Sequence, residues 1–249
     1  MIFDTQLIHK TVERAEKFGL KIATCELLKN LGVTSISKRG TIPKSGPLLI
    51  ISNHTGIFDS LLLLNQIERN DYFFIALSTY EIFGTKIKEK LIPIYRKRQL
   101  NHKVYEYPLS LQVSRCLPVN LPEQEIRFRN RNSITKAAQL INEGNAVSIF
   151  PSGSAGKKIT KNHWKAGIGF LIKQITNPHT QVIFVQIQGT KQSDIVAYLH
   201  PFIRKILFRP RPISICFSKS YLLTQIVDQN TDAKIITTEF EKLYLKQWK

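Results

Sequence analysis

The sequence predicts an α/β fold, with a central, largely parallel or mixed sheet flanked by helices and preceded by a helical N-terminal segment. Short apolar runs, typical of buried strands, alternate along the chain with stretches whose apolar residues recur every three or four positions. The 249 residues are enough for one large domain. We divide this single domain, 1–249, into a helical segment at 1–35, a core at 40–220 and a C-terminal helix at 228–249.

The N-terminal half begins with a helical stripe and continues with two strands. From Ile8 to Leu28, residues 6–31 place an apolar residue at every third or fourth position. This pattern fits a helix packed on its own domain or, as the alternative, one that lies on a membrane. Two apolar runs separated by a helical pattern at 61–67 predict buried strands at Leu48–Ser52 and Tyr72–Leu77. Residues 81–115 are basic and irregular, and no element is assigned there.

The second half of the chain again alternates helical stretches with apolar strands. Ser133 has the character of a helix N-cap, and the apolar face that follows it ends at Gly144. Another helix is expected from about Trp164 to Ile175. Three further strands are expected at Ala146–Phe150, Val182–Ile187 and Ile213–Phe217. Because such folds place their chemistry in the loops at strand ends, the residues that follow the strands are the candidates for a site.

Charge and cysteine content narrow the class of protein. The chain has 36 Lys and Arg against 18 Asp and Glu, a formal charge of +18, which indicates polyanionic partners such as nucleic acid, anionic lipid, acidic carrier proteins or phosphorylated substrates. Cys25, Cys116 and Cys216 lie far apart, which argues against a disulfide framework or a zinc site and favours a reducing compartment. No signal peptide and no apolar run of about 18–20 residues is visible, so we expect a cytoplasmic protein, soluble or peripheral on the membrane surface.

The first polar cluster is Asn53-His54-Thr55-Gly56-Ile57-Phe58-Asp59, directly after an expected strand. Histidine is the side chain best suited to general-base work near neutral pH, and a nearby carboxylate can fix its tautomer. His54 and Asp59 can meet only if His54 lies in the turn and Asp59 lies in the first turn of the following helix. The alternative is a surface histidine with Asp59 as an ordinary carboxylate at a helix N-terminus.

The second cluster runs from Phe150 to Lys158 and also follows an expected strand. Its glycine-rich turn and the lysines Lys157 and Lys158 suit an anionic group, although a solvated basic turn is the alternative. A Walker loop is excluded because Pro151 stands where its first glycine would be. A nucleophile elbow is excluded because Ser152 stands where glycine is required.

Together the two clusters resemble glycerolipid acyltransferases of the lysophosphatidate acyltransferase type. An N-H-x4-D block is followed, 96 residues after His54, by an F-P-x-G block, and the similarity runs from about Gly40 to Ile187. The resemblance implies that His54 and Asp59 form a catalytic dyad. It also implies that Ser152 and Gly153, in the F-P-x-G block, help to hold a phosphorylated acceptor or the oxyanion.

The remaining blocks of that family are matched less closely. Ser152 and Ala155 stand where the family has glutamate and arginine, which leaves Lys157 or Lys158 to supply the charge and leaves the identity of the acceptor open. The family's second block usually carries an arginine. Its candidates here are Arg127, Arg129 and Arg131, or Arg96 from the similarly worded 92–96 stretch. Val185-Gln186-Ile187 resembles the fourth block, with glutamine in place of its usual proline.

The resemblance implies transfer of a fatty acyl group in phospholipid biosynthesis. The donor would be acyl-CoA or an acyl carrier protein, and the acceptor a hydroxyl of glycerol 3-phosphate, lysophosphatidate or a related lysolipid. No metal, redox cofactor or nucleic acid is expected. We expect docking on an anionic membrane through the mixed apolar and basic segment Tyr198–Arg211. The alternatives are a basic nucleic-acid-binding protein and a serine hydrolase that uses Ser154.

Overall fold

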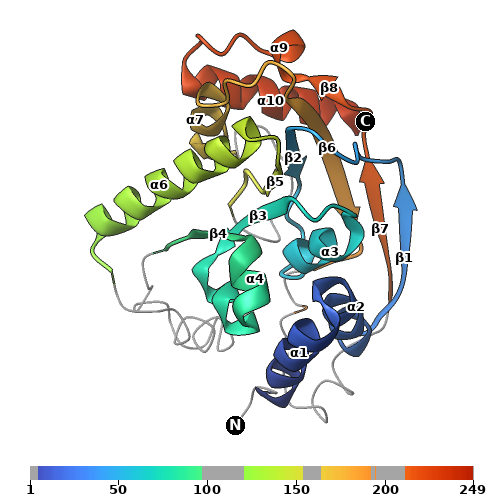
Figure 1. The fold of residues 1–249 in the computed structure, drawn as a ribbon. Helices are drawn as coiled ribbons and strands as arrows, with labels where there is room; N and C mark the ends of the chain where they lie inside the picture. Colours follow the sequence, from blue (N-terminus) through green and yellow to red (C-terminus); the bar gives the residue numbers. More distant parts are fainter. Residues whose placement is uncertain (1–4, 97–120, 154–163, 192–193, 195–210, 249) are drawn as a thin grey trace, which may run out of the picture.

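The computed structural model describes residues 5–96, 121–153, 164–191, 194 and 211–248, and it confirms the predicted α/β fold (Figure 1). Among these residues an eight-stranded sheet has the order β1-β7-β6-β2-β5-β3-β4, with β8 paired to β6. Its strands are β1 Val33–Arg39, β2 Leu48–Ser52, β3 Tyr72–Leu77, β4 Leu91–Ile94, β5 Ala146–Ile149, β6 Gln181–Gln188, β7 Arg211–Phe217 and β8 Tyr221–Leu222.

The sheet is mixed. Strands β2 to β6 run parallel to their neighbours in this group, whereas β7 and β8 run antiparallel to β6, and β1 is parallel to β7. Ile51 of β2 is paired with Ile149 of β5. The chain leaves both strands at the same edge, so His54 and Ser152, each three residues further on, lie beyond that carboxyl edge.

Helices cover both faces of the sheet (Figure 1). The elements on one face are α1 Thr5–Phe18, α2 Leu20–Asn30, α3 Asp59–Gln66, the 3-10 helix η1 Ser78–Phe83 and α4 Thr85–Lys90. Those on the other face are α6 Glu123–Asn142, α7 Gly167–Lys173, the short α9 Leu223–Ile226 and α10 Ala233–Gln247. The central strand β2 packs Leu48 and Ile50 against the first group and Leu49 and Ile51 against the second, and all four are fully buried.

The N-terminal stripe is divided between two helices. Gly19, with φ of 86°, separates α1 from α2, and such a left-handed conformation interrupts a helix at little steric cost only for glycine. The two helices pack against each other, and Arg14 forms an ion pair with Glu26. Phe18 and Ile22, two apolar residues of the expected stripe, flank this break and are exposed.

The expected helix start at Ser133 is wrong. Helix α6 begins at Glu123, and Ser133 lies inside it, where its hydroxyl group donates to the carbonyl oxygen of Pro93 at 2.6 Å. The first half of α6 is polar and is supported by i,i+4 ion pairs of Arg127 with Glu123 and of Arg129 with Glu125. An apolar periodicity therefore appears only where the helix reaches the sheet.

Candidate active site

His54 and Asp59 are joined by a hydrogen bond of 2.9 Å between Nδ1 and Oδ2. His54 lies in the turn after β2 and its side chain is 19% exposed, whereas Asp59 is the first residue of α3 and is completely buried. This is the arrangement that the spacing of the two residues requires if they are to meet. With the ionised carboxylate accepting from Nδ1–H, the Nε2 atom carries the lone pair that a general base needs.

The same carboxylate oxygen also holds the turn. Oδ2 of Asp59 accepts hydrogen bonds from the main-chain N–H groups of Thr55 at 2.7 Å and Gly56 at 2.9 Å. Hydrogen bonds to a charged acceptor are stronger than those between neutral groups. The imidazole, the turn and the start of α3 therefore form one unit.

Asn53 anchors this turn to the sheet. Its side-chain amide donates to the carbonyl oxygen of Ile187 at 2.8 Å and accepts from the N–H group of Ile187 at 2.7 Å. These two bonds take the place of a main-chain peptide group beside β6, just after β2 ends at Ser52. The chain can thus turn away from the sheet without leaving the peptide group of Ile187 unpaired.

The other side of the turn packs against the segment that follows β6. A Cβ atom on Gly56 would lie 2.6 Å from Cβ of Thr190 and 2.7 Å from the main-chain nitrogen of Lys191, so only glycine fits there. The hydroxyl groups of Thr55 and Thr190 are 2.5 Å apart. Asp194 in turn accepts from the N–H group of Lys191 at 2.7 Å, which fixes the segment on which the turn packs.

Phe150 brings the second cluster to the first. Its ring stacks on the imidazole of His54, with 4.6 Å between centroids and 30° between planes. The N–H group of Gly153 donates to the carbonyl oxygen of Phe150 at 2.9 Å and closes the turn, with Gly153 at φ of 64°. The Gly153 N–H group is thus engaged within the turn.

Lys165 is a basic residue of this region that the sequence reasoning missed. Its main-chain N–H group donates to the carbonyl oxygen of Pro151 at 2.9 Å, and its side chain is packed beside Gly153. Lys165 is 14 residues from Pro151 in the sequence and reaches the turn only through the fold. No local sequence pattern therefore distinguished it from the other lysines.

Some of the residues expected to bind substrate or membrane lie outside the described part of the chain. The expected phosphate ligands Lys157 and Lys158 are among them, as are Ser154 and the expected membrane-docking segment 198–211 apart from Arg211. Arg96 follows β4, whose carboxyl end lies at the same edge of the sheet as that of β5. Arg96 is exposed, but neighbouring groups desolvate its guanidinium in part and lower its pKa. No acidic group in the described part of the chain forms an ion pair with it.

The three arginines of α6 stand apart from the dyad. Arg127 and Arg129 are engaged by glutamates of their own helix, and Arg131 is exposed. Figure 1 shows this end of α6 extending beyond the sheet. Within the described ranges, no contact joins any of the three to His54 or Phe150.

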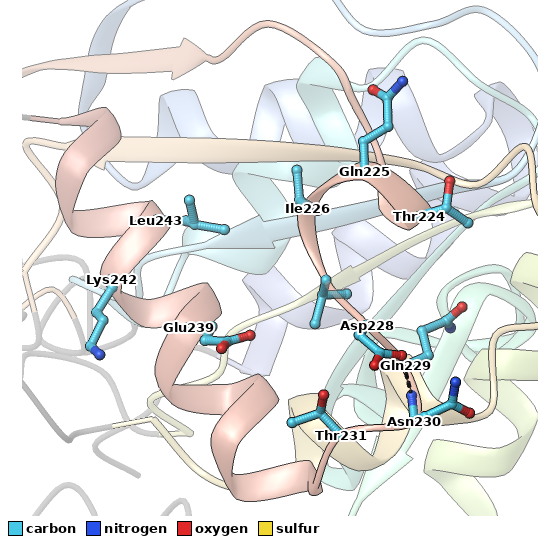
Figure 2. A pocket seen from close by; sticks show the side chains of 11 residues that line it. Thr224, Gln225, Ile226, Asp228, Gln229, Asn230, Thr231, Glu239, Lys242 and Leu243 are labelled. Atoms are coloured by element: carbon cyan, nitrogen blue, oxygen red, sulfur yellow. Dashed lines mark hydrogen bonds between the residues drawn. The ribbon is translucent and has the colours of Figure 1, made fainter.

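A cavity lies at the amino edge of the parallel strands, opposite the carboxyl edge that carries His54. This open cavity has a volume of about 920 Å³. Figure 2 shows the residues that line it, which are 224–231 together with Glu239, Lys242 and Leu243 of α10. The adjoining Leu223 donates its N–H group to Thr180, directly before the start of β6. The cavity is therefore at the amino edge, away from His54.

The described residues contain neither a metal-binding cluster nor a membrane-spanning helix. In the described ranges no three His, Cys, Asp or Glu side chains are grouped so that they could hold a metal ion. Nor does any helix there combine the length and the apolar character needed to cross a bilayer.

Residues 34–188 match the family model described as Acyltransferase. No curated protein matches the chain significantly. Among solved structures, the chain is similar to the 1-acyl-sn-glycerophosphate acyltransferase PlsC of Thermotoga maritima, with a TM-score of 0.52 and 14% identity over 95% of this chain and 84% of that one. At this identity the likeness concerns the fold.

Proposed function

The chain belongs to the acyltransferase family, and from this premise we propose that it transfers a fatty acyl group from a thioester to a hydroxyl group of a phosphorylated glycerol compound or lysolipid. The observation that carries the proposal is the His54–Asp59 hydrogen bond, with the imidazole stacked on Phe150 at the carboxyl edge of the sheet. The name of the structurally similar PlsC, an acyltransferase for 1-acyl-sn-glycerophosphate, supports an acceptor of this class.

In the proposed reaction, Nε2 of His54 takes the proton of the acceptor hydroxyl as its oxygen attacks the thioester carbonyl. The C–O bond forms and the C–S bond breaks, and the imidazolium returns the proton to the departing thiolate. Asp59 keeps the proton on Nδ1 and stabilises the imidazolium. The products are the ester and a free thiol, so no oxidant or metal is needed to balance the step.

We assign the oxyanion of the tetrahedral intermediate to main-chain N–H groups at the turn after β5, with Ser152 and Gly153 as the candidates. Preorganised donors of this kind contribute by facing the charge as it develops. For the acceptor phosphate, the candidates carried over from the sequence are Arg96, Arg131, Lys157 and Lys158. Arg127 and Arg129 are weaker candidates because carboxylates already engage them.

The donor and the location of the enzyme are also part of the proposal. Acyl-CoA and an acidic acyl carrier protein are both polyanionic, and a formal charge of +18 favours the approach of either. Since an acyl acceptor or product resides in a bilayer, we propose peripheral docking on anionic lipid through the 198–211 segment.

The decisive experiment is lipid mass spectrometry of the purified protein. The protein is mixed with acyl-CoA or acyl carrier protein as donor and with a panel of acceptors that includes glycerol 3-phosphate and lysophosphatidate. A new ester together with stoichiometric free thiol is the expected result. Thioester cleavage that yields only free fatty acid would identify a hydrolase instead, and an intact thioester with every acceptor would reject the proposal.

A further inference from the structure

Lys165 occupies a defined place beside the Pro151–Gly153 turn. A Cβ atom on Gly153 would lie 3.6 Å from Cγ of Lys165, which places the stem of the lysine against the turn. The turn in turn carries Phe150, whose ring contacts His54. One turn therefore contacts Lys165 through Gly153 and His54 through Phe150.

The main chain fixes the beginning of this lysine side chain. The hydrogen bond from Lys165 N–H to the carbonyl oxygen of Pro151 attaches the residue to the turn, while the residue itself is exposed. No carboxylate of the described residues forms an ion pair with it. The charge is therefore available to an anionic ligand, unlike the charges of Arg127 and Arg129.

We propose that Lys165 binds the phosphate group of the acyl acceptor and thereby sets the preference of the enzyme for phosphorylated acceptors. This inference rests on the proposed function. The ammonium group acts as a point charge that can donate hydrogen bonds to phosphate oxygens. In this proposal the phosphate lies beside the Pro151–Gly153 turn and the glycerol hydroxyl group faces His54, where Nε2 takes its proton.

The test compares Lys165→Gln with Lys173→Gln. Lys173 lies on the following helix, α7, and its ammonium group donates instead to the carbonyl oxygen of Thr231 at 2.8 Å. With lysophosphatidate we expect Lys165→Gln to raise the acceptor KM about ten- to a hundredfold, the range for losing a hydrogen bond to a charged group. The kcat and the donor KM stay within about twofold, because a phosphate contact is made in the ground state and the transition state alike.

Two controls make this result specific. Monoacylglycerol, which lacks the phosphate, should show the same KM with the wild type, Lys165→Gln and Lys173→Gln. Lys165→Arg, which keeps the charge, should recover most of the lost affinity for lysophosphatidate. An equal rise in KM for both acceptors would show that Lys165 only packs the turn, and a rise confined to the donor KM would show that it binds the donor. Either result overturns the proposal.

A binding measurement keeps the proposal testable independently of turnover. Calorimetry with glycerol 3-phosphate should give at least tenfold weaker binding to Lys165→Gln than to the wild type and to Lys173→Gln. Equal binding by all three proteins would overturn the assignment even if transfer is observed. If the wild type transfers no acyl group but the calorimetric difference is present, the proposed function fails while the phosphate site at Lys165 stands.

Discussion

The imidazole of His54 and the ring of Phe150 stack with 4.6 Å between centroids, although 96 residues separate them in the chain. The parallel pairing of β2 with β5 explains this proximity, because the two strands end side by side at the same edge. Asp59 fixes the imidazole by a hydrogen bond in the ring plane, and Phe150 restricts it from one face. The two sequence blocks therefore build one site.

The first prediction concerns the dyad. His54→Ala should lower kcat about 10²- to 10⁴-fold, the usual contribution of a general base, without lowering Tm appreciably. Asp59→Asn should also lower kcat strongly, because the amide no longer holds the proton on Nδ1. The matched control is His179→Ala, since His179 is exposed beyond the opposite end of β6. Full activity of a well-folded His54→Ala protein would reject the dyad.

The second prediction concerns the stacking residue. Phe150→Leu keeps an apolar side chain but removes the ring that lies on His54, so the imidazole gains freedom to rotate. Stacked aromatic pairs contribute about 0.5–1.5 kcal/mol, and we expect kcat to fall about threefold to tenfold while the acceptor KM changes little. Phe170→Leu is the control, because the Phe170 side chain is 55% exposed on α7. A loss seen only in KM would assign Phe150 to substrate binding instead.

Sequence patterns predicted the structure correctly where a segment's own residues determine it. Leu48–Ser52 is fully buried on both faces and therefore reads as an apolar run. The strand Val33–Arg39 was missed because most of its side chains are exposed, and only its pairing with β7 makes it a strand. The contact of His54 with Asp59 could be predicted because the two residues belong to one turn. Lys165 could not, because its place depends on how the chain returns to Pro151.

The third prediction concerns the close approach at Gly56. Gly56→Ala places a methyl group against Thr190 and the main chain of Lys191, so the turn must move. Overpacking of this kind costs about 1–3 kcal/mol in the free energy of unfolding. We expect a lower midpoint of urea unfolding and reduced kcat, since His54 belongs to the same turn. Gly167→Ala is the control, because its Cβ would meet only Ile134, at 3.9 Å, and it should be neutral or slightly stabilising.

The fourth prediction concerns stability at acid pH. The guanidinium of Arg69, whose side chain is fully buried, donates to both carboxylate oxygens of Asp71, and these hydrogen bonds lower the pKa of Asp71 below its usual value of 3.8. A carboxylate whose pKa is lower in the folded state stabilises the fold above the unfolded pKa, and this stabilisation is lost as the pH falls through the folded pKa.

Urea unfolding between pH 7 and pH 2 tests this prediction. Asp71→Asn should be less stable than the wild type at pH 7, and the difference should shrink below about pH 4, where the unfolded carboxyl group is protonated. Asp228→Asn is the control, since no arginine of the described residues pairs with Asp228. A difference between wild type and Asp71→Asn that stays constant over the whole range would contradict the lowered pKa.

The fifth prediction concerns the contact of α10 with β6, the strand to which the His54 turn is attached. Tyr244 of α10 is buried, and its hydroxyl group donates to the carbonyl oxygen of Val185 at 2.9 Å. Val185 lies two residues before Ile187, whose peptide group is hydrogen-bonded to Asn53. Burial raises the pKa of the Tyr244 phenol, which therefore stays a neutral donor at physiological pH. Tyr244→Phe keeps the ring but removes a buried hydrogen bond to this carbonyl oxygen, which costs about 1–3 kcal/mol in the free energy of unfolding. The control is Tyr221→Phe, whose hydroxyl group bonds the half-exposed Gln247, so that its loss should cost less than about 1 kcal/mol. Equal urea midpoints for Tyr244→Phe and the wild type would show that the Val185 carbonyl group does not need this donor and that α10 supports the strand through ring packing alone.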